Sequence, residues 1–94
     1  MATIVIKTLW NGASFELEDV DLEQITNRYL IQQMIDSGVM LSEAELPISN
    51  SGLKRKYFVL DKKRQPHPSD EVKSIAELGY CDGDEVWFVL PAWN

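Results

Sequence analysis

The chain has 94 residues, of which 45% are hydrophobic and 26% charged, and its formal net charge is −6. This length suits a single domain spanning residues 1–94 with one core, and the composition excludes wholesale disorder. The acidic balance disfavours nucleic acid as the main partner. Six of the nine basic residues lie within 54–64, whereas residues 16–23 hold five acids and no base. This distribution predicts a basic surface on an acidic body, although two solvated strand ends around a buried apolar run would also explain it.

The sequence predicts a cytoplasmic location. Cys81 is the only cysteine, so no intrachain disulfide can form. The N-terminus has neither a basic n-region nor a long apolar h-region, and no apolar stretch approaches the ~18 residues of a membrane span. We therefore expect no membrane insertion.

The first expected element is a β-hairpin. Residues 3–10 are mostly β-branched or apolar, and Asn11-Gly12 is a strong turn signal. Residues 14–20 then alternate between apolar and polar with period two, with an irregularity near Asp19. The inward positions of this second strand are Phe15, Leu17 and Val20.

A helix is expected next. Asp21 can act as its N-cap, the helix should run to about Ser37, and Gly38 can supply the left-handed residue that ends it. The stripe that should pack on the sheet consists of Leu22, Ile25, Tyr29, Leu30 and Met34. Ile31 and Ile35 project to the other side, which we assign to packing under the following loop.

The rest of the chain predicts a long connection and two strands. Residues 39–53 form the connection, with one short helical turn at 42–46. Residues 56–60 form a third strand, and Pro66 and Pro68 exclude a regular central strand beyond it. Residues 72–80 form a short helical turn with Ile75 and Leu78 toward the core, followed by a tight turn at Gly83. Residues 85–90 form a last strand that is too apolar for a bare edge.

This order of elements is a β-grasp arrangement, an α+β fold in which a mixed sheet of four to five strands packs on one helix. Two stretches resemble ubiquitin. Residues 4–9, which end in Lys-Thr-Leu, resemble its opening strand, and residues 74–90 follow the ubiquitin-like family's pattern of a short turn before a final strand.

Residues near the C-terminus resemble one group within the ubiquitin-like family. Residues 80–86, Tyr-Cys-Asp-Gly-Asp-Glu-Val, are similar to the turn and last strand of YukD/EsaB-like proteins, small ubiquitin-fold components of bacterial type VII (WXG) secretion loci. The resemblance implies a cytoplasmic accessory role, with secretion-system components as partners. The alternative is a ubiquitin-like modifier or a sulfur-carrier relative. Residues 91–94, Pro-Ala-Trp-Asn, lack the diglycine tail that conjugation needs.

Few residues are candidates for catalysis or metal binding. His67 is the only histidine and lies between two prolines, without a nearby cysteine or patterned carboxylates. The acidic neighbours of Cys81 disfavour the thiolate that a nucleophile needs. Asp82 and Asp84 lack the spacing of a calcium loop. We therefore expect a non-enzymatic domain with no metal and no cofactor.

The outer face of the sheet, on the side away from the helix, is the expected protein-binding surface. Period-two alternation assigns it, with Ile4, Ile6, Phe58, Leu60, Val86 and Phe88 facing inward. The predicted binding residues are Val5, Lys7, Val59, Lys62, Lys63, Trp87 and Val89. Ubiquitin's recognition patch occupies the corresponding face, and an exposed Trp is a typical interaction anchor. A loop, Trp93 or a second copy of the chain could instead cover this surface.

Overall fold

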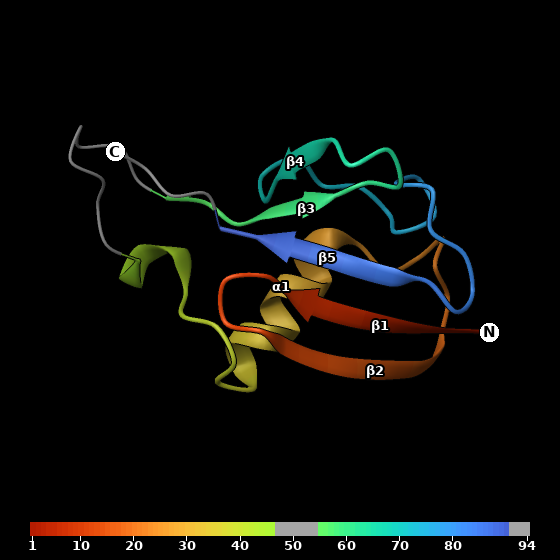
Figure 1. Cartoon of the computed structure of the whole chain (residues 1–94), viewed down its shortest axis with the longest axis horizontal. Helices are drawn as coiled ribbons and strands as arrows, with labels where there is room; N and C mark the ends of the chain where they lie inside the picture. Colours follow the sequence, from red (N-terminus) through yellow and green to blue (C-terminus); the bar gives the residue numbers. More distant parts are fainter. Residues whose placement is uncertain (47–54, 91–94) are drawn as a thin grey trace.

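The computed structural model describes residues 1–46 and 55–90, which form a five-stranded mixed sheet packed on one helix (Figure 1). The strands are β1 (Ala2–Thr8), β2 (Ala13–Val20), β3 (Phe58–Leu60), β4 (Pro66–Pro68) and β5 (Glu85–Val89); the helices are α1 (Asn27–Asp36) and the 3-10 turn η1 (Glu43–Glu45). The predicted α+β class of β-grasp type is confirmed. Lys54, the second half of the 39–53 connection, and residues 91–94 with Trp93 lie outside the described residues.

The first and last strands form the centre of the sheet. The spatial order is β2-β1-β5-β3-β4, and β1 and β5 are parallel while every other neighbouring pair is antiparallel. The sheet lies in front of α1 in Figure 1. The inward side chains of the central pair, Ile4, Ile6, Val86 and Phe88, are each at most 1% exposed. The prediction that residues 85–90 do not form an edge is therefore confirmed.

The helix begins later than the sequence predicts. Asp21 caps only a turn, in which its carboxylate accepts from the amide of Glu23 (3.0 Å). The helix begins at Asn27, and Thr26 is its N-cap, because the Thr26 hydroxyl accepts from the amide of Tyr29 (3.0 Å). Thr26 is also bridged to Ser74 in an antiparallel β-type pairing. This tertiary pairing holds Thr26 extended and prevents the helix from starting earlier.

The buried face of α1 is shifted accordingly. Leu30, Ile31 and Met34 are at most 5% exposed, whereas Tyr29 is 49% exposed, so its predicted place in the core stripe is wrong. Ile31 is buried in the same core cluster as Leu30 and Met34, so its predicted projection to the other side of the helix is wrong. The helix ends as expected, because Gly38 adopts a left-handed φ of 82° after the C-cap Ser37.

The loops match the sequence prediction more closely. The 3-10 turn η1 lies within the predicted 42–46 segment, Ile75 and Leu78 are buried, and Gly83 has a φ of 86°. The predicted irregularity near Asp19 is a register shift in the β1–β2 pairing, where Asp19 adopts a φ of 56°.

The orientation predicted for β3 is wrong. Val59 is fully buried and pairs with the buried Phe88, whereas Phe58 and Leu60 are only half-buried and face outward. The segment Tyr-Phe-Val-Leu at 57–60 contains no polar residue that would mark the solvent side. Pairing with β5 therefore decides the orientation, and Val59 cannot belong to the outer surface.

Two valines on opposite faces of the sheet test this orientation. We expect Val59→Ala to lower the free energy of unfolding by roughly 2 kcal/mol, because it removes two buried methyl groups and leaves a cavity. The same substitution at the half-buried, outward Val89 should cost much less. Urea denaturation of both variants measures the difference, and equal losses would contradict the assigned faces.

A buried asparagine ties the start of α1 to the chain that precedes β5. Asn27 is fully buried. Its side-chain amide donates to the carbonyl of Glu71 (3.1 Å), its side-chain oxygen accepts from the amide of Lys73 (2.9 Å), and its backbone amide donates to the carbonyl of Lys73 (3.0 Å). Because these partly buried bonds join two segments that are distant in sequence, this side chain is a structural clamp.

Removing the Asn27 side chain should lower the stability of the domain. We expect Asn27→Ala to destabilise the domain by about 1–3 kcal/mol, since it leaves the partly buried Lys73 amide and Glu71 carbonyl without this partner. Gln32→Ala is a matched control, because Gln32 is an exposed amide on the same helix whose side chain donates to Asp36 (2.8 Å), one turn further along α1. Thermal or urea unfolding should separate the two variants, and an Asn27 effect as small as the Gln32 effect would contradict the clamp.

Candidate protein-binding surface

Five apolar side chains lie together on the outer face of the sheet, and we call them the outer apolar patch. They alternate with the inward residues of three adjacent strands. Each is half-buried. The patch consists of Val5, Phe58, Leu60, Trp87 and Val89. The direct pairing of Phe58 with Val89 makes the patch continuous from β3 to β5.

Arg64 covers part of Trp87. Its guanidinium carbon lies 4.9 Å from the centroid of the Trp87 ring, within the range of a cation–π contact. Within the described residues, no carboxylate lies at ion-pair distance from Arg64. A guanidinium stacked in this way keeps its N–H donors available for a carboxylate on another molecule.

The β3–β4 turn places Arg64 over the patch. Asp61 organises this turn, because its Oδ1 accepts from the amides of Lys63 (2.8 Å) and Gln65 (2.9 Å) and its Oδ2 bonds to Nε2 of His67 (2.8 Å). Arg64 then adopts a φ of 64°, which non-glycine residues rarely adopt. The side chain of Asp61 stabilises this backbone conformation.

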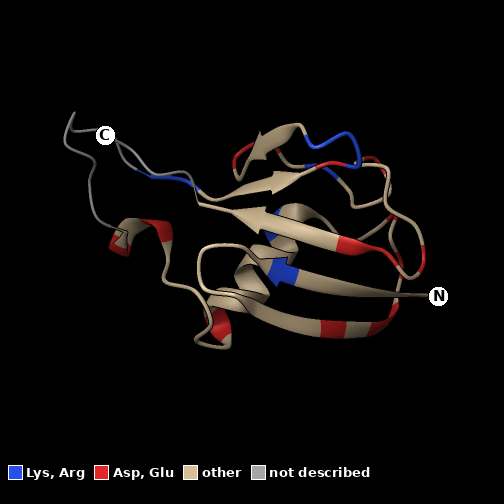
Figure 2. Cartoon of the chain, in the orientation of Figure 1, with Lys and Arg blue, Asp and Glu red and all other residues tan. Residues whose placement is uncertain are grey.

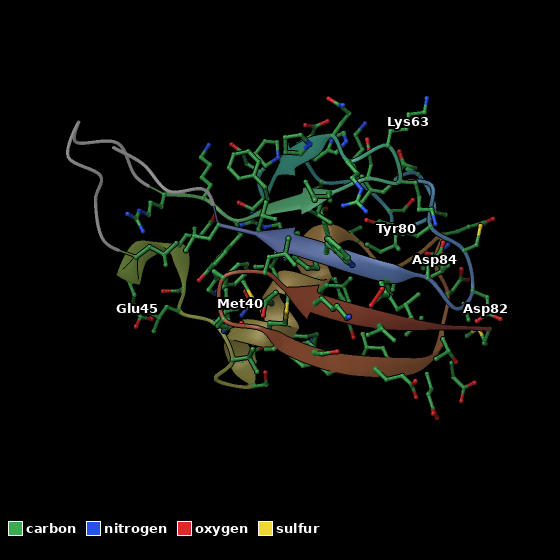
Figure 3. All side chains as sticks on the ribbon, in the orientation of Figure 1. Met40, Glu45, Lys63, Tyr80, Asp82 and Asp84 are labelled. Atoms are coloured by element: carbon green, nitrogen blue, oxygen red, sulfur yellow. The ribbon has the colours of Figure 1, made fainter. Side chains whose placement is uncertain are left out.

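A hollow of about 320 Å³ lies at one end of the patch. Its lining includes Leu60, Trp87, Tyr80, Lys62 and Asp84. Figure 3 shows Tyr80 and Asp84 close together beside the end of the sheet where β5 begins. Burial raises the pKa of Tyr80, and its hydroxyl donates to the carbonyl of Leu60. The hollow is therefore amphipathic, because aromatic and charged side chains both line it.

The predicted basic residues have different environments. Lys62 Nζ lies 3.1 Å from Asp84 and 5.8 Å from the centroid of the Tyr80 ring, so this lysine lines the hollow. The amide of Cys81 and then Lys62 lower the pKa of Asp84. Lys7 forms a salt bridge of 2.6 Å with Glu85 at the border of the patch. Lys63 is exposed on the β3–β4 turn, on the far side of that turn from Tyr80 in Figure 3.

The structure therefore brings together Val5, Trp87 and Val89 and replaces Val59 with Phe58 and Leu60. Sequence reasoning also missed Arg64. The alternation rule could have found Phe58 and Leu60 if the pairing of β3 with β5 had been known. Nothing in the sequence indicates the left-handed backbone that turns Arg64 over Trp87.

The described residues contain no group of three or more His, Cys, Asp or Glu side chains arranged to hold a metal ion. His67 lies between two carboxylates, with Nδ1 at 3.3 Å from Glu71 and Nε2 at 2.8 Å from Asp61. Cys81 is exposed. In residues 1–46 and 55–90, no helix has the length and apolarity needed to cross a bilayer.

Neither the protein-family models nor the curated protein sequences contain a match to this chain. The physical features of the outer apolar patch are therefore the basis for assigning a function.

The contacts of His67 predict a pH dependence of stability. The hydrogen bond to Asp61 raises the pKa of His67 above 6.5, and Glu71 raises it further. The same bond lowers the pKa of Asp61 below 3.8. The His67 contribution is therefore full below pH 6.5 and is lost as the pH rises through the raised pKa. The Asp61 contribution is present above pH 3.8 and is lost as the pH falls through the lowered pKa.

Wild type and His67→Gln should accordingly differ most in free energy of unfolding between pH 3.8 and pH 6.5. The difference should shrink at about pH 9, where the imidazole is neutral in the folded and unfolded states. Urea denaturation of both proteins at about pH 5 and about pH 9 measures this change. A difference that is the same at both values would show that His67 is not charged in this contact.

Proposed function

We propose that this chain is a non-catalytic ubiquitin-like domain that binds other proteins through the outer apolar patch. The observation that carries this proposal is a half-buried Trp87 on the outer face, flanked by four apolar side chains and covered in part by Arg64. Trp and Arg are the residue types that most often dominate the energy of protein interfaces.

The arrangement of the patch supports a docking role. Strands β1, β3 and β5 hold its members on a hydrogen-bonded scaffold, so little conformational entropy is lost when a partner binds. A charged border surrounds the apolar centre, with Lys7 paired to Glu85 on one side and Lys62 paired to Asp84 on another. An apolar centre within a polar rim is the usual anatomy of a protein interface.

The resemblance at residues 80–86 leads us to propose, in addition, a cytoplasmic accessory role in a bacterial type VII secretion system. In the structure this stretch contains the Gly83 turn and the start of β5. The turn lies beside the outer apolar patch, because Gly83 and Asp84 line the same hollow as Leu60 and Trp87. A partner on the patch would therefore also contact the segment that carries the resemblance.

Truncating Trp87 tests the binding role. We expect Trp87→Ala to weaken partner binding by more than about 2 kcal/mol, which is about thirtyfold in affinity, because it removes the central anchor of the patch. The fold should persist, since Trp87 lies on the outer face of the sheet and not in the core. Affinity purification with wild-type and variant baits, followed by titration calorimetry on the recovered partner, measures the loss.

Tyr29→Ala is the matched control for this experiment. Tyr29 is an aromatic residue that is 49% exposed on α1, on the other side of the sheet. Its truncation should leave partner binding unchanged. Equal binding by folded Trp87→Ala and wild-type baits would overturn the patch as the site. Recovery of partners that are not secretion-locus proteins would overturn the secretion role alone.

A further inference from the structure

The sheet has two edges with different chemistry. On the β4 side, the amide of Ser69 donates to the carbonyl of Tyr57 and that of Asp61 to the carbonyl of Gln65, both at 3.0 Å. Successive residues of a strand direct their backbone N–H and C=O groups to opposite sides. Because Gln65 and Ser69 bond to the β3 side, the backbone groups of Pro66 and Pro68 face the open side. Proline has no N–H group, and this edge therefore offers no donors at those two positions.

The β2 edge carries donors. The amides of Val5 and Leu9 donate to carbonyls on the β5 side at 3.0 Å, so the intervening residues of β1 direct their backbone groups toward β2. Their partners on β2 are Ala13, Phe15 and Leu17. By the same alternation, the N–H and C=O groups of Ser14 and Glu16 face away from the sheet. No described strand pairs with β2 on that side.

An apolar groove runs beside this open edge. It encloses about 320 Å³ between the inner face of β2 and the end of α1. Its apolar lining comes from Ile6, Phe15, Leu17, Leu30, Met34 and Val39. Phe15, Leu17 and Val39 are half-buried and pack against the core. The groove is therefore an extension of the core that the domain itself leaves partly open.

The outer side of the same edge is acidic. Glu16 and Glu18 are exposed, and no Lys, Arg or His among the described residues forms a salt bridge with either. Figure 2 shows acidic residues along β2, continuing into the segment that follows it. A strand added here would place alternate side chains in the apolar groove and the others beside these two carboxylates.

We propose that the β2 edge is a second binding site, which accepts an extended segment of a partner protein with alternating apolar and basic residues. Backbone hydrogen bonds to Ser14 and Glu16 would supply affinity, and the groove and the carboxylates would select the two sets of side chains. A second copy of this chain does not fit, because antiparallel β2–β2 pairing would bring the two rows of glutamates together. This site does not depend on the outer apolar patch.

Three synthetic peptides test the proposal with the full chain. The probe is acetyl-Lys-Val-Lys-Ile-Lys-Val-Lys-amide, and the controls replace either every Lys by Glu or the central Ile by Pro. The lysine peptide should shift the amide resonances of β2 and slow hydrogen exchange at Ser14 and Glu16. The glutamate peptide should fail through charge, and the proline peptide because a proline ring at its centre interrupts strand pairing.

Charge reversal on the protein is the decisive comparison. We expect Glu16→Lys/Glu18→Lys to lower the affinity for the lysine peptide roughly tenfold or more and to create binding of the glutamate peptide, because the sign of both cross-strand pairs is inverted. Glu45→Lys makes the same substitution at an exposed site on η1. Glu45→Lys should leave the affinity for the lysine peptide almost unchanged, whereas the single variant Glu18→Lys should lower it.

Glu16→Pro separates strand addition from simple charge attraction. It removes an N–H that faces the open edge and leaves the β1–β2 hydrogen bonds intact, so binding should be lost while circular dichroism stays native. If this variant does not fold, the peptide preference of Glu16→Lys/Glu18→Lys still tests the β2 site. Resonance shifts confined to Phe58 and Trp87, equal binding of the lysine and glutamate peptides, or unchanged binding by folded Glu16→Pro would each overturn the β2 site.

Discussion

The parallel pairing of β1 with β5 is the constraint on which the rest of the structure depends. It joins the first and last strands at the centre of the sheet, with Val5 opposite Glu85 and Lys7 opposite Trp87. Because the inward residues of both strands are excluded from water, a slip of one position would place Ile6 or Phe88 in solvent. The same pairing therefore fixes which residues form the outer face and leaves β2 and β4 as the two edges.

Long-range hydrogen bonds from polar side chains then set the loops on this sheet. Asn27 holds the segment at 71–73 against the start of α1. Glu43 on η1 bonds to the residue before β3 and the residue after β4, because its carboxylate accepts from the amide of Tyr57 (2.8 Å) and the hydroxyl of Ser69 (2.7 Å). Asp61 shapes the turn that carries Arg64. These bonds satisfy backbone amides, a backbone carbonyl and a hydroxyl that the sheet itself leaves without partners.

The two apolar surfaces of the domain have different charged borders. Bases and acids together border the outer apolar patch, where Lys7 pairs with Glu85 and Lys62 with Asp84. At the β2 edge, Glu16 and Glu18 form no salt bridge with another described residue, and Figure 2 shows acidic residues along β2. A border of paired charges and a border of acids favour partners of different kinds, because like charges at an interface are unfavourable.

Local sequence patterns determined many of the turns, strands and helix ends of this protein. The Asn11-Gly12 turn, the alternation in β2, the end of the helix at Gly38 and the apolar last strand are all readable because each depends on residues close in sequence. Only the tertiary structure decided three features. The pairing of Thr26 with Ser74 delays the helix, the pairing of β3 with β5 turns Val59 inward, and the Asp61 turn places Arg64 over Trp87. In each case the deciding partner lies on another segment or in a backbone conformation that residue type does not encode, so periodicity and propensity cannot reveal it.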